Sequence, residues 1–240
     1  MIKIAHAYDN LLNLYGSWAN CAVLERYLSE AGYEVRLSSF TIGEYIDLSS
    51  FDLVYFGAAT ERRMLLAVND FRRYLTELKE FIDDDRILFV TGNSMAIFGN
   101  TITDKDGMKY QATSLFNFDA TIHTKRRYSE LILTSQLTDM PVIGNINSSM
   151  DISLGNETPM FHVVKETQGR RKVEGVQKNH LYVTEVSGPI LVRNPYLLHS
   201  FAEIVAGKTL PLSVSGWFTN ATKGYQTQLL KLKKELKVNG

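Results

Sequence analysis

The residues best suited to chemistry form a short polar stretch that directly follows an apolar strand pattern. The apolar pattern covers residues 86–91, and the residues after it are Gly92-Asn93-Ser94-Met95-Ala96. A glycine, then a serine and a small residue at every second position, fit a loose form of the sharp strand-to-helix turn that presents a nucleophilic hydroxyl. The stretch therefore suggests Ser94 as a nucleophile. The alternative is a serine that caps the turn or helix.

A serine nucleophile needs a histidine base within hydrogen-bond reach. The chain has five histidines, which are His6, His123, His162, His180 and His199. His6 ends the first strand pattern, which makes it a candidate for a place near the site. His162 and Glu166 lack a convincing third ligand, so no metal site is predicted, and no cofactor is expected.

A parallel sheet is expected to position these residues. The first half of the chain alternates strand and helix patterns, with strands expected at 2–7, 34–40, 52–57 and 86–91 and helices at 17–31 and 65–82. Repeated strand, helix and strand units predict a right-handed, three-layer α/β fold with a mainly parallel central sheet. Sites in such sheets form at the carboxyl ends of the strands, here near Tyr8, Gly57 and Thr91.

The second half of the chain changes character. Residues 108–165 read as short strands separated by turns, and 195–206 as a helix with Pro195 at its start. Residues 225–238 predict a peripheral surface helix with one apolar stripe, and membrane attachment is the lesser alternative. No repeat or linker divides the chain, so a single domain over 1–240 is expected.

The composition excludes several classes of partner. Lys plus Arg equals Asp plus Glu at 26 each, which argues against nucleic-acid binding. No apolar run approaches the ~18 residues of a membrane span, and the N-terminal MIKIAHAY is unlike a signal peptide. The one cysteine, Cys21, allows no internal disulfide. These features predict a cytoplasmic protein.

Three stretches carry a family resemblance. They are residues 10–16 (NLLNLYG) with Asn20 nearby, residues 57–62 (GAATER), and residues 187–191 (SGPIL) with Asn194-Pro195. Together and in this order they resemble the cobyric-acid-synthase-type (CobB/CobQ-like) glutamine amidotransferases, over roughly residues 2–206. The chain looks most similar to the small subunit that supplies ammonia to a Mur-ligase-like partner acting on the peptidoglycan precursor lipid II.

The resemblance implies a flavodoxin-like class I amidotransferase fold, a synthetase partner and a small amino-acid-like ligand. It also implies a cysteine nucleophile on the turn after the fourth strand and a histidine base in the third stretch. The nucleophile position here is Thr91 or Gly92, depending on the register, and the base position is Ser187. Cys21 belongs to the first helix and is expected to be a small core residue.

Ligand-binding positions are also implied by the resemblance. Glu61 and Arg62 stand where the family places its oxyanion loop, and Asn93 lies on the nucleophile turn. Arg127 corresponds to an arginine that helps to hold an amino-acid carboxylate. The alternatives are a surface ion pair for Glu61 with Arg62 and a solvated basic turn for Arg127.

Two classes of function follow from these observations. The first is a binding or regulatory subunit that keeps the amidotransferase fold without glutaminase activity, since neither the cysteine nor the histidine is present. The second is an enzyme, either a divergent amidotransferase or a serine hydrolase that uses Ser94.

Overall fold

The computed structural model describes residues 1–169 and 171–238 and contains two six-stranded sheets. The first has the order β11-β12-β4-β3-β1-β2. Its parallel strands are β1 (Ile2–Ala7), β2 (Val35–Phe40), β3 (Leu53–Phe56), β4 (Ile87–Val90) and β12 (Leu181–Val183), and β11 (Val176–Lys178) joins antiparallel. The predicted mainly parallel sheet and its first four strands are confirmed.

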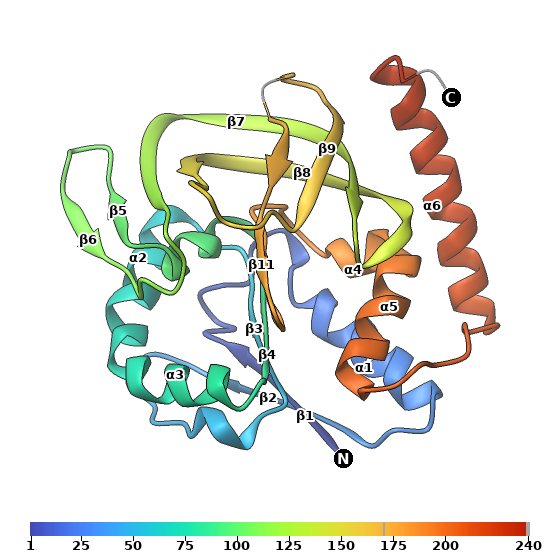
Figure 1. Ribbon diagram of the computed structural model, residues 1–240, viewed down its shortest axis with the longest axis horizontal. Helices are drawn as coiled ribbons and strands as arrows, with labels where there is room; N and C mark the ends of the chain where they lie inside the picture. The colour runs from blue at the N-terminus through green and yellow to red at the C-terminus, as the bar shows by residue number, and fades with distance from the viewer. Residues whose placement is uncertain (170, 239–240) are drawn as a thin grey trace.

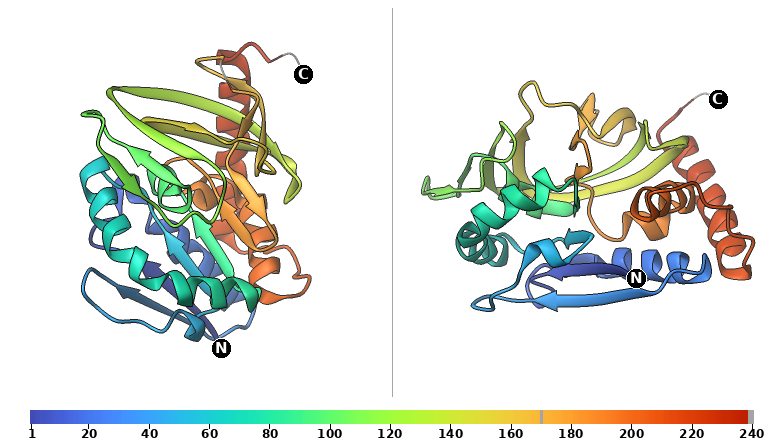
Figure 2. Two further views of the ribbon diagram at one scale, coloured as in Figure 1. Left: turned by 60° about the vertical axis from the view of Figure 1, so that its left-hand side comes forward. Right: turned by 60° about the horizontal axis from the view of Figure 1, so that its bottom comes forward.

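Helices cover both faces of this sheet (Figure 2). The helices are α2 (Glu61–Phe71) and α3 (Leu75–Asp83) on one face, and α1 (Ala19–Glu30), α4 (Ile190–Arg193) and α5 (Pro195–Ala206) on the other. Successive strand residues point to opposite faces. Val54 and Phe56 accordingly pack in the α2–α3 layer, while Leu53 and Tyr55 pack with α1 and α5. The result is the three-layer arrangement.

The helix expected over 65–82 is not continuous, which corrects the prediction. Thr60 caps α2, because its side chain accepts a hydrogen bond from the backbone N–H of Arg63. A short 3₁₀ turn at Arg72–Tyr74 then separates α2 from α3. Tyr74 has φ −97° and ψ 17°, outside helical geometry, and its hydroxyl donates to the carbonyl of Glu44. This tertiary contact accompanies the break.

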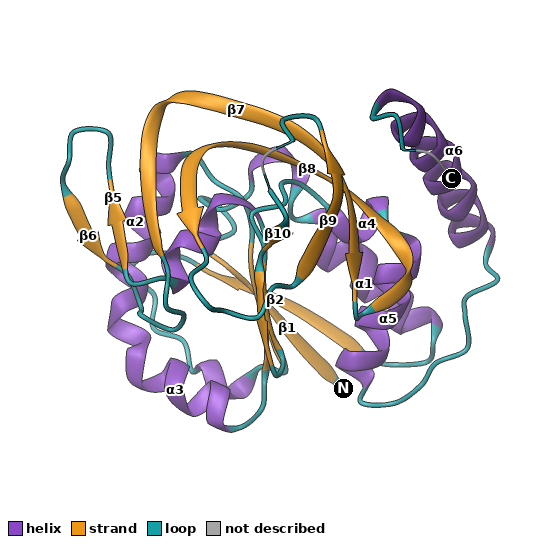
Figure 3. Ribbon diagram, turned by 45° about the horizontal axis from the view of Figure 1, so that its top comes forward, coloured by secondary structure: helices purple, strands orange, loops and turns teal. Residues whose placement is uncertain are grey.

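A second sheet is built around one long hairpin, so the expectation of only short strands over 108–165 was wrong. The hairpin strands are β7 (Asp119–Ser135) and β8 (Thr138–Ser153), of 17 and 16 residues (Figure 3). The sheet is completed by β5 (Thr101–Thr103), β6 (Lys109–Gln111), β9 (Phe161–Glu166) and β10 (Val173–Glu174). A register shift between Ile122 and Arg127 accommodates a polar segment without ending the strand.

The hairpin arches over the carboxyl edge of the parallel sheet (Figure 1). Ile122 of β7 and Met150 of β8 are buried in the same core cluster as Met95 and Phe98, which follow β4. The edge where the sequence places the candidate site is therefore covered by the second sheet.

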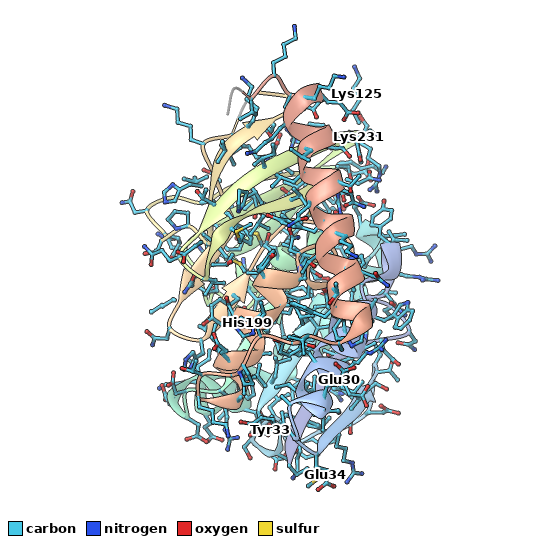
Figure 4. The ribbon with its side chains drawn as sticks, turned by 90° about the vertical axis from the view of Figure 1, so that its right-hand side faces the viewer. Glu30, Tyr33, Glu34, Lys125, His199 and Lys231 are labelled. Atoms are coloured by element: carbon cyan, nitrogen blue, oxygen red, sulfur yellow. The ribbon has the colours of Figure 1, made fainter. Side chains whose placement is uncertain are left out.

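The C-terminal helix α6 (Gly216–Glu235) begins well before the predicted start at residue 225. Figure 4 looks onto this helix, with Lys231 in its second half. Tyr225, Leu229 and Leu232 are buried against Ile132 and Ile143 of the hairpin. Across residues 1–169 and 171–238, no helix is both long and apolar enough to cross a membrane.

Candidate functional site

The turn after β4 has different backbone conformations at Thr91 and Gly92, the two positions that the resemblance allows for the nucleophile. Thr91 is extended, with φ −129° and ψ 149°, whereas Gly92 has φ +72° and opens a 3₁₀ helix, Gly92–Phe98. A sharp, strained residue between strand and helix is the position that a nucleophile occupies in such turns. Of the two positions that the resemblance allows, the backbone geometry favours Gly92. Thr91 is fully buried, and its hydroxyl hydrogen-bonds the Tyr55 hydroxyl at 2.7 Å.

The space beside Gly92 is filled. A Cβ atom built on Gly92 would lie 2.5 Å from the Cβ and 3.0 Å from the Cα of Ala58. Carbon atoms in van der Waals contact stand about 3.5–4.0 Å apart. A side chain of any kind at the nucleophile position therefore requires the Ala58 backbone to move.

The loop that follows β3 uses its own backbone donors internally. Ala58 N–H donates to Ser17 Oγ at 3.3 Å, and Ala59 N–H donates to Asn93 Oδ1 at 2.9 Å. Asn93 Nδ2 returns a hydrogen bond of 2.8 Å to the Ala59 carbonyl. An oxyanion hole needs N–H groups aimed at the reacting oxygen. Asn93 holds this loop in place through these two hydrogen bonds, and its ligand-binding role stays a prediction.

The loop after β3 starts at Gly57 because another part of the backbone passes close to this position. A Cβ at this position would lie 2.2 Å from the carbonyl oxygen of Leu12 and 2.5 Å from Ser17 Oγ. The chain segment after β1 thus packs directly on the backbone of the segment after β3. Only a residue without a side chain allows this approach.

Ser94 makes a structural hydrogen bond in this geometry, and its role as an alternative nucleophile stays a prediction. Its side chain is fully buried, and its hydroxyl donates to the Gly57 carbonyl at 2.5 Å. A nucleophilic hydroxyl has to face the substrate and a base. The hydrogen bond instead ties the turn after β4 to the end of β3.

Four of the five histidines have partners away from the turn after β4. His6 Nε2–H donates to the Leu12 carbonyl at 3.3 Å, and burial lowers the pKa of this imidazole, which favours its neutral form. His199, labelled in Figure 4, bonds the Tyr27 hydroxyl at 2.6 Å. His123 pairs with Asp151 and His180 with Asp85. Within the described residues, no hydrogen bond joins a histidine to Ser94 or Ser187.

Ser187 lies beside Gly92. The carbonyl of the preceding residue, Val186, accepts a hydrogen bond from Gly92 N–H at 3.0 Å. Ser187 is 3% exposed, and its Oγ accepts from Asn147 N–H at 3.2 Å. The structure thus places the segment that holds Ser187 next to Gly92, through the hydrogen bond between Gly92 and Val186. Gly92 has no group that can attack, and Ser187 has none that takes up a proton near neutral pH.

Arg126, which the sequence analysis missed, spans the outside of this region. Its guanidinium donates to Glu61 Oε1 at 2.7 Å, to the Asn147 carbonyl at 2.9 Å and to the Tyr15 hydroxyl at 3.2 Å. Glu61 also accepts from Ser149 Oγ at 2.5 Å. Glu61 is therefore part of the region, but its ionic partner is Arg126 and not Arg62, which is exposed.

Arg127, the arginine that the sequence suggested, is directed elsewhere. Its guanidinium donates to the Met150 carbonyl at 2.6 Å and pairs with the Asp151 carboxylate. Neighbouring residues of a strand point to opposite faces. The register shift beside Arg127 decides which of the two arginines reaches Glu61, and sequence alone does not reveal that shift.

Asn20 joins segments of the chain that lie far apart in the sequence. Its Nδ2 donates to the Tyr55 hydroxyl at 2.9 Å and to the Gly188 carbonyl at 3.3 Å, and its Oδ1 accepts from Leu191 N–H at 2.9 Å. Asn20 thereby connects the first and third stretches of the resemblance. The residue lies in the first stretch, but only its contacts show this role.

The His, Cys, Asp and Glu side chains form no metal-binding cluster among the described residues, and the one cysteine is buried. Over residues 1–169 and 171–238, no group of three or more His, Cys, Asp or Glu side chains is placed to hold a metal ion. Cys21 is buried in the α1 layer, and burial raises the pKa of its thiol. A buried, protonated thiol is a poor nucleophile.

The fold and the turn after β4 define an α/β protein built like a class I amidotransferase. The chain belongs to the CobB/CobQ-like glutamine amidotransferase domain family, whose family model matches residues 3–190. A solved glutamine amidotransferase structure covers 85% of this chain and 98% of its own, with a TM-score of 0.52 and 11% identity. That likeness confirms the fold.

Two curated relatives carry the same name, "Lipid II isoglutaminyl synthase (glutamine-hydrolyzing) subunit GatD". The protein from Streptococcus pneumoniae is 21% identical over 202 residues, covering 82% of this chain and 78% of the relative. The protein from Staphylococcus aureus is 24% identical over 211 residues, covering 84% and 85%. The predicted resemblance to this group is confirmed.

Proposed function

We propose that this chain is an amidotransferase-family subunit that has lost glutaminase activity and acts through a partner protein. The observation that carries the proposal is the 2.5 Å separation between a Cβ built on Gly92 and the Cβ of Ala58. The nucleophile has been lost, and the volume that its side chain would occupy has been filled.

The remaining groups do not replace the lost chemistry. Amide hydrolysis in this family passes through a thioester and needs a thiolate with a base nearby. Thr91 and Ser94 donate or share their hydroxyl hydrogens within the protein, and Ser187 cannot act as the base. In a well-studied triad, removing nucleophile and base together costs on the order of 10⁶ in kcat.

The partner is proposed to be a Mur-ligase-like synthetase. Both curated relatives are named as subunits of a synthase, and each aligns over more than four fifths of this chain. Tyr15, Tyr128 and Val192 are 41%, 51% and 42% exposed, and Tyr15 lies against Arg126. Aromatic and arginine side chains are enriched in protein interfaces. A small amino-acid-like ligand is less well supported than a protein partner. The charged groups that would bind such a ligand, Arg126 and Glu61, already bond each other.

The test is a glutaminase assay on the purified chain, alone and with a Mur-ligase-like synthetase from the same organism. We expect no ammonia release above background in either case, together with a stable complex in size-exclusion chromatography. Ammonia release at ordinary enzyme rates that disappears in Ser94→Ala would refute the proposal and identify a serine-dependent enzyme. A cytoplasmic location is part of the proposal and is supported by the single cysteine.

A further inference from the structure

Strand β2 leaves one edge of the parallel sheet open. In the described part of the chain, β2 is the last strand of the sheet on this side, and only β1 pairs with it. In the right-hand view of Figure 2, β2 lies at the lower margin of the molecule. An open edge presents a row of unpaired N–H and C=O groups, which is a template for a further strand.

The pairing with β1 shows which backbone groups of β2 are free. Ile2 N–H donates to the Glu34 carbonyl at 2.7 Å, and the register then continues unbroken to the end of β2. Even-numbered residues of this segment therefore direct their backbone groups at β1. Because the direction alternates along a strand, the N–H and C=O groups of Val35, Leu37 and Ser39 point to the open edge. Among the described residues, no other segment donates to these groups or accepts from them.

The other strands at the margins of the two sheets are shorter or are covered. β11 and β6 have three residues each, and β10 has two. Along the long strand β8, Asn194 bonds the backbone of Ile143, and Ser187 accepts from Asn147 N–H. β2 has six residues with no proline, lysine or bulge, and Arg36 is its one charged residue. It therefore lacks most of the features that keep edge strands from pairing.

Apolar side chains are exposed in β2 and directly after it. Leu37, at the middle of the strand, is 39% exposed, and Ile42 and Tyr45 are 43% and 77% exposed. Leu37 pairs with Ile4, whose side chain packs in the α1 layer, so Leu37 lies on the α1 face of the sheet. Exposed apolar side chains beside free backbone groups are typical of an association surface.

We infer that β2 pairs antiparallel with β2 of a second copy of this chain, about a two-fold axis at Leu37. The free backbone groups are arranged symmetrically about this residue. Val35 then faces Ser39 of the second copy, and Leu37 faces its own counterpart. Each of these facing residues exchanges two hydrogen bonds, so all the free groups find partners. An interface of this kind is self-complementary, because the same patch serves both copies.

The charges of this edge suit an identical partner. Arg36 comes opposite Ser38 of the second copy, so no like charges face each other directly across the pair. The chain has 26 basic and 26 acidic residues, and two neutral copies do not repel each other at long range. A register centred on Val35 would pair Glu34 with Arg36, but exposed ion pairs contribute little, and the groups of Ser39 would stay free.

The pairing leaves the region around the turn after β4 accessible. Strands β3 and β1 separate β2 from β4, which precedes the turn at Gly92. A synthetase partner at that turn and a second copy at β2 therefore occupy different parts of the sheet. The inference does not depend on the loss of glutaminase activity, because the mass of the chain in solution tests it without any partner.

The experiment places charges across the two-fold axis. Wild-type protein should form a dimer that dissociates on dilution, measured by analytical ultracentrifugation against 27.2 kDa for one chain. Leu37→Glu and Leu37→Lys each bring two like charges face to face, so each variant alone should be monomeric. An equimolar mixture of the two variants should dimerise again, because a glutamate then faces a lysine.

Leu75→Glu is the matched control, since Leu75 is also 39% exposed but lies on α3. This variant should dimerise like the wild type. A wild type that stays monomeric at every concentration would overturn the inference. A mixture of Leu37→Glu and Leu37→Lys that stays monomeric while the wild type dimerises would overturn it as well.

Hydrogen exchange tests the same pairing in wild-type protein without any substitution. The amides of Val35, Leu37 and Ser39 should exchange more slowly at high protein concentration than at low concentration. The Arg36 amide is the internal control, because it faces β1 in the monomer and in the dimer. Protection that reaches Val35 and Leu37 but not Ser39 would place the axis at Val35 and overturn the inference.

Discussion

Gly92 and Ala58 complement each other in shape, because the Cβ of Ala58 occupies the place next to the Cα of Gly92 where a nucleophile's side chain would start. The two residues come from neighbouring parallel strands, and each lies just beyond its strand. The local packing at this turn thus opposes any side chain at position 92 unless Ala58 also changes.

The first prediction is that Gly92→Ala is destabilising for two separable reasons. Its positive φ costs ~1–2 kcal/mol for a non-glycine residue, and the contact with Ala58 adds ~1–3 kcal/mol of overpacking. Gly207→Ala is the matched control, since Gly207 has φ +64° and open space at its Cβ. In urea unfolding, Gly92→Ala should lose more stability than Gly207→Ala, and adding Ala58→Gly should recover the difference. Equal losses for both alanine variants would contradict the steric argument.

The second prediction concerns rebuilt catalysis. Gly92→Cys with Ser187→His should remain inactive, because the cysteine lacks space and the donors on Ala58 and Ala59 stay occupied. Adding Ala58→Gly should give at most a trace of activity, measured as ammonia release from glutamine. Robust turnover by the double variant alone would show that the loop after β3 rearranges readily.

The third prediction is that Ser94→Ala lowers stability without changing any activity. The substitution leaves the buried Gly57 carbonyl without its donor, at a cost of about 1–3 kcal/mol. Ser50→Ala is the control, because its hydroxyl also donates to a backbone carbonyl, that of Asp47, but in an exposed position. The control should change the free energy of unfolding by less than ~0.5 kcal/mol. Similar effects at both serines would argue against a stabilising role for the buried hydrogen bond between Ser94 and the Gly57 carbonyl.

The fourth prediction is a pH dependence set by Glu174. Its pKa is raised in the folded state from 4.5 to about 7 by burial, so the folded protein holds this proton more tightly than the unfolded chain does. The associated stability is present below about pH 4.5 and is lost as the pH rises to about 7. The loss amounts to ~3 kcal/mol.

Glu174→Gln should flatten this part of the stability curve, measured by urea unfolding between pH 4.5 and 7.5. Glu80→Gln, on the surface, should retain the wild-type slope. A wild-type slope in Glu174→Gln would assign the pH dependence to other groups.

The fifth prediction tests Asn20 as the connection between distant parts of the chain. Asn20→Leu should destabilise by several kcal/mol, because it leaves the Tyr55 hydroxyl, the Gly188 carbonyl and Leu191 N–H short of a partner at a buried position. Asn220→Leu, exposed on α6, should have little effect in the same thermal unfolding assay. One cooperative transition in these scans would also support the prediction of a single domain.

Local sequence patterns determined the parallel core and the residue types at the positions that the resemblance assigns to nucleophile and base. Short apolar runs ending at Gly57 and Thr91 identify buried parallel strands, because such strands are covered on both faces. The identities of Gly92 and Ser187 show by themselves that no thiolate and no imidazole stand at these positions. These conclusions depend only on residue type and order along the chain.

Tertiary contacts determined the structural roles of the residues at and around those positions. The choice between Arg126 and Arg127 depends on a register shift in β7, and the role of Ser94 depends on which carbonyl its hydroxyl meets. The filled space at Gly92 depends on Ala58, 34 residues earlier in the chain. Such outcomes require the relative placement of two backbones to within a few tenths of an ångström, and residue order does not specify distances between separate strands.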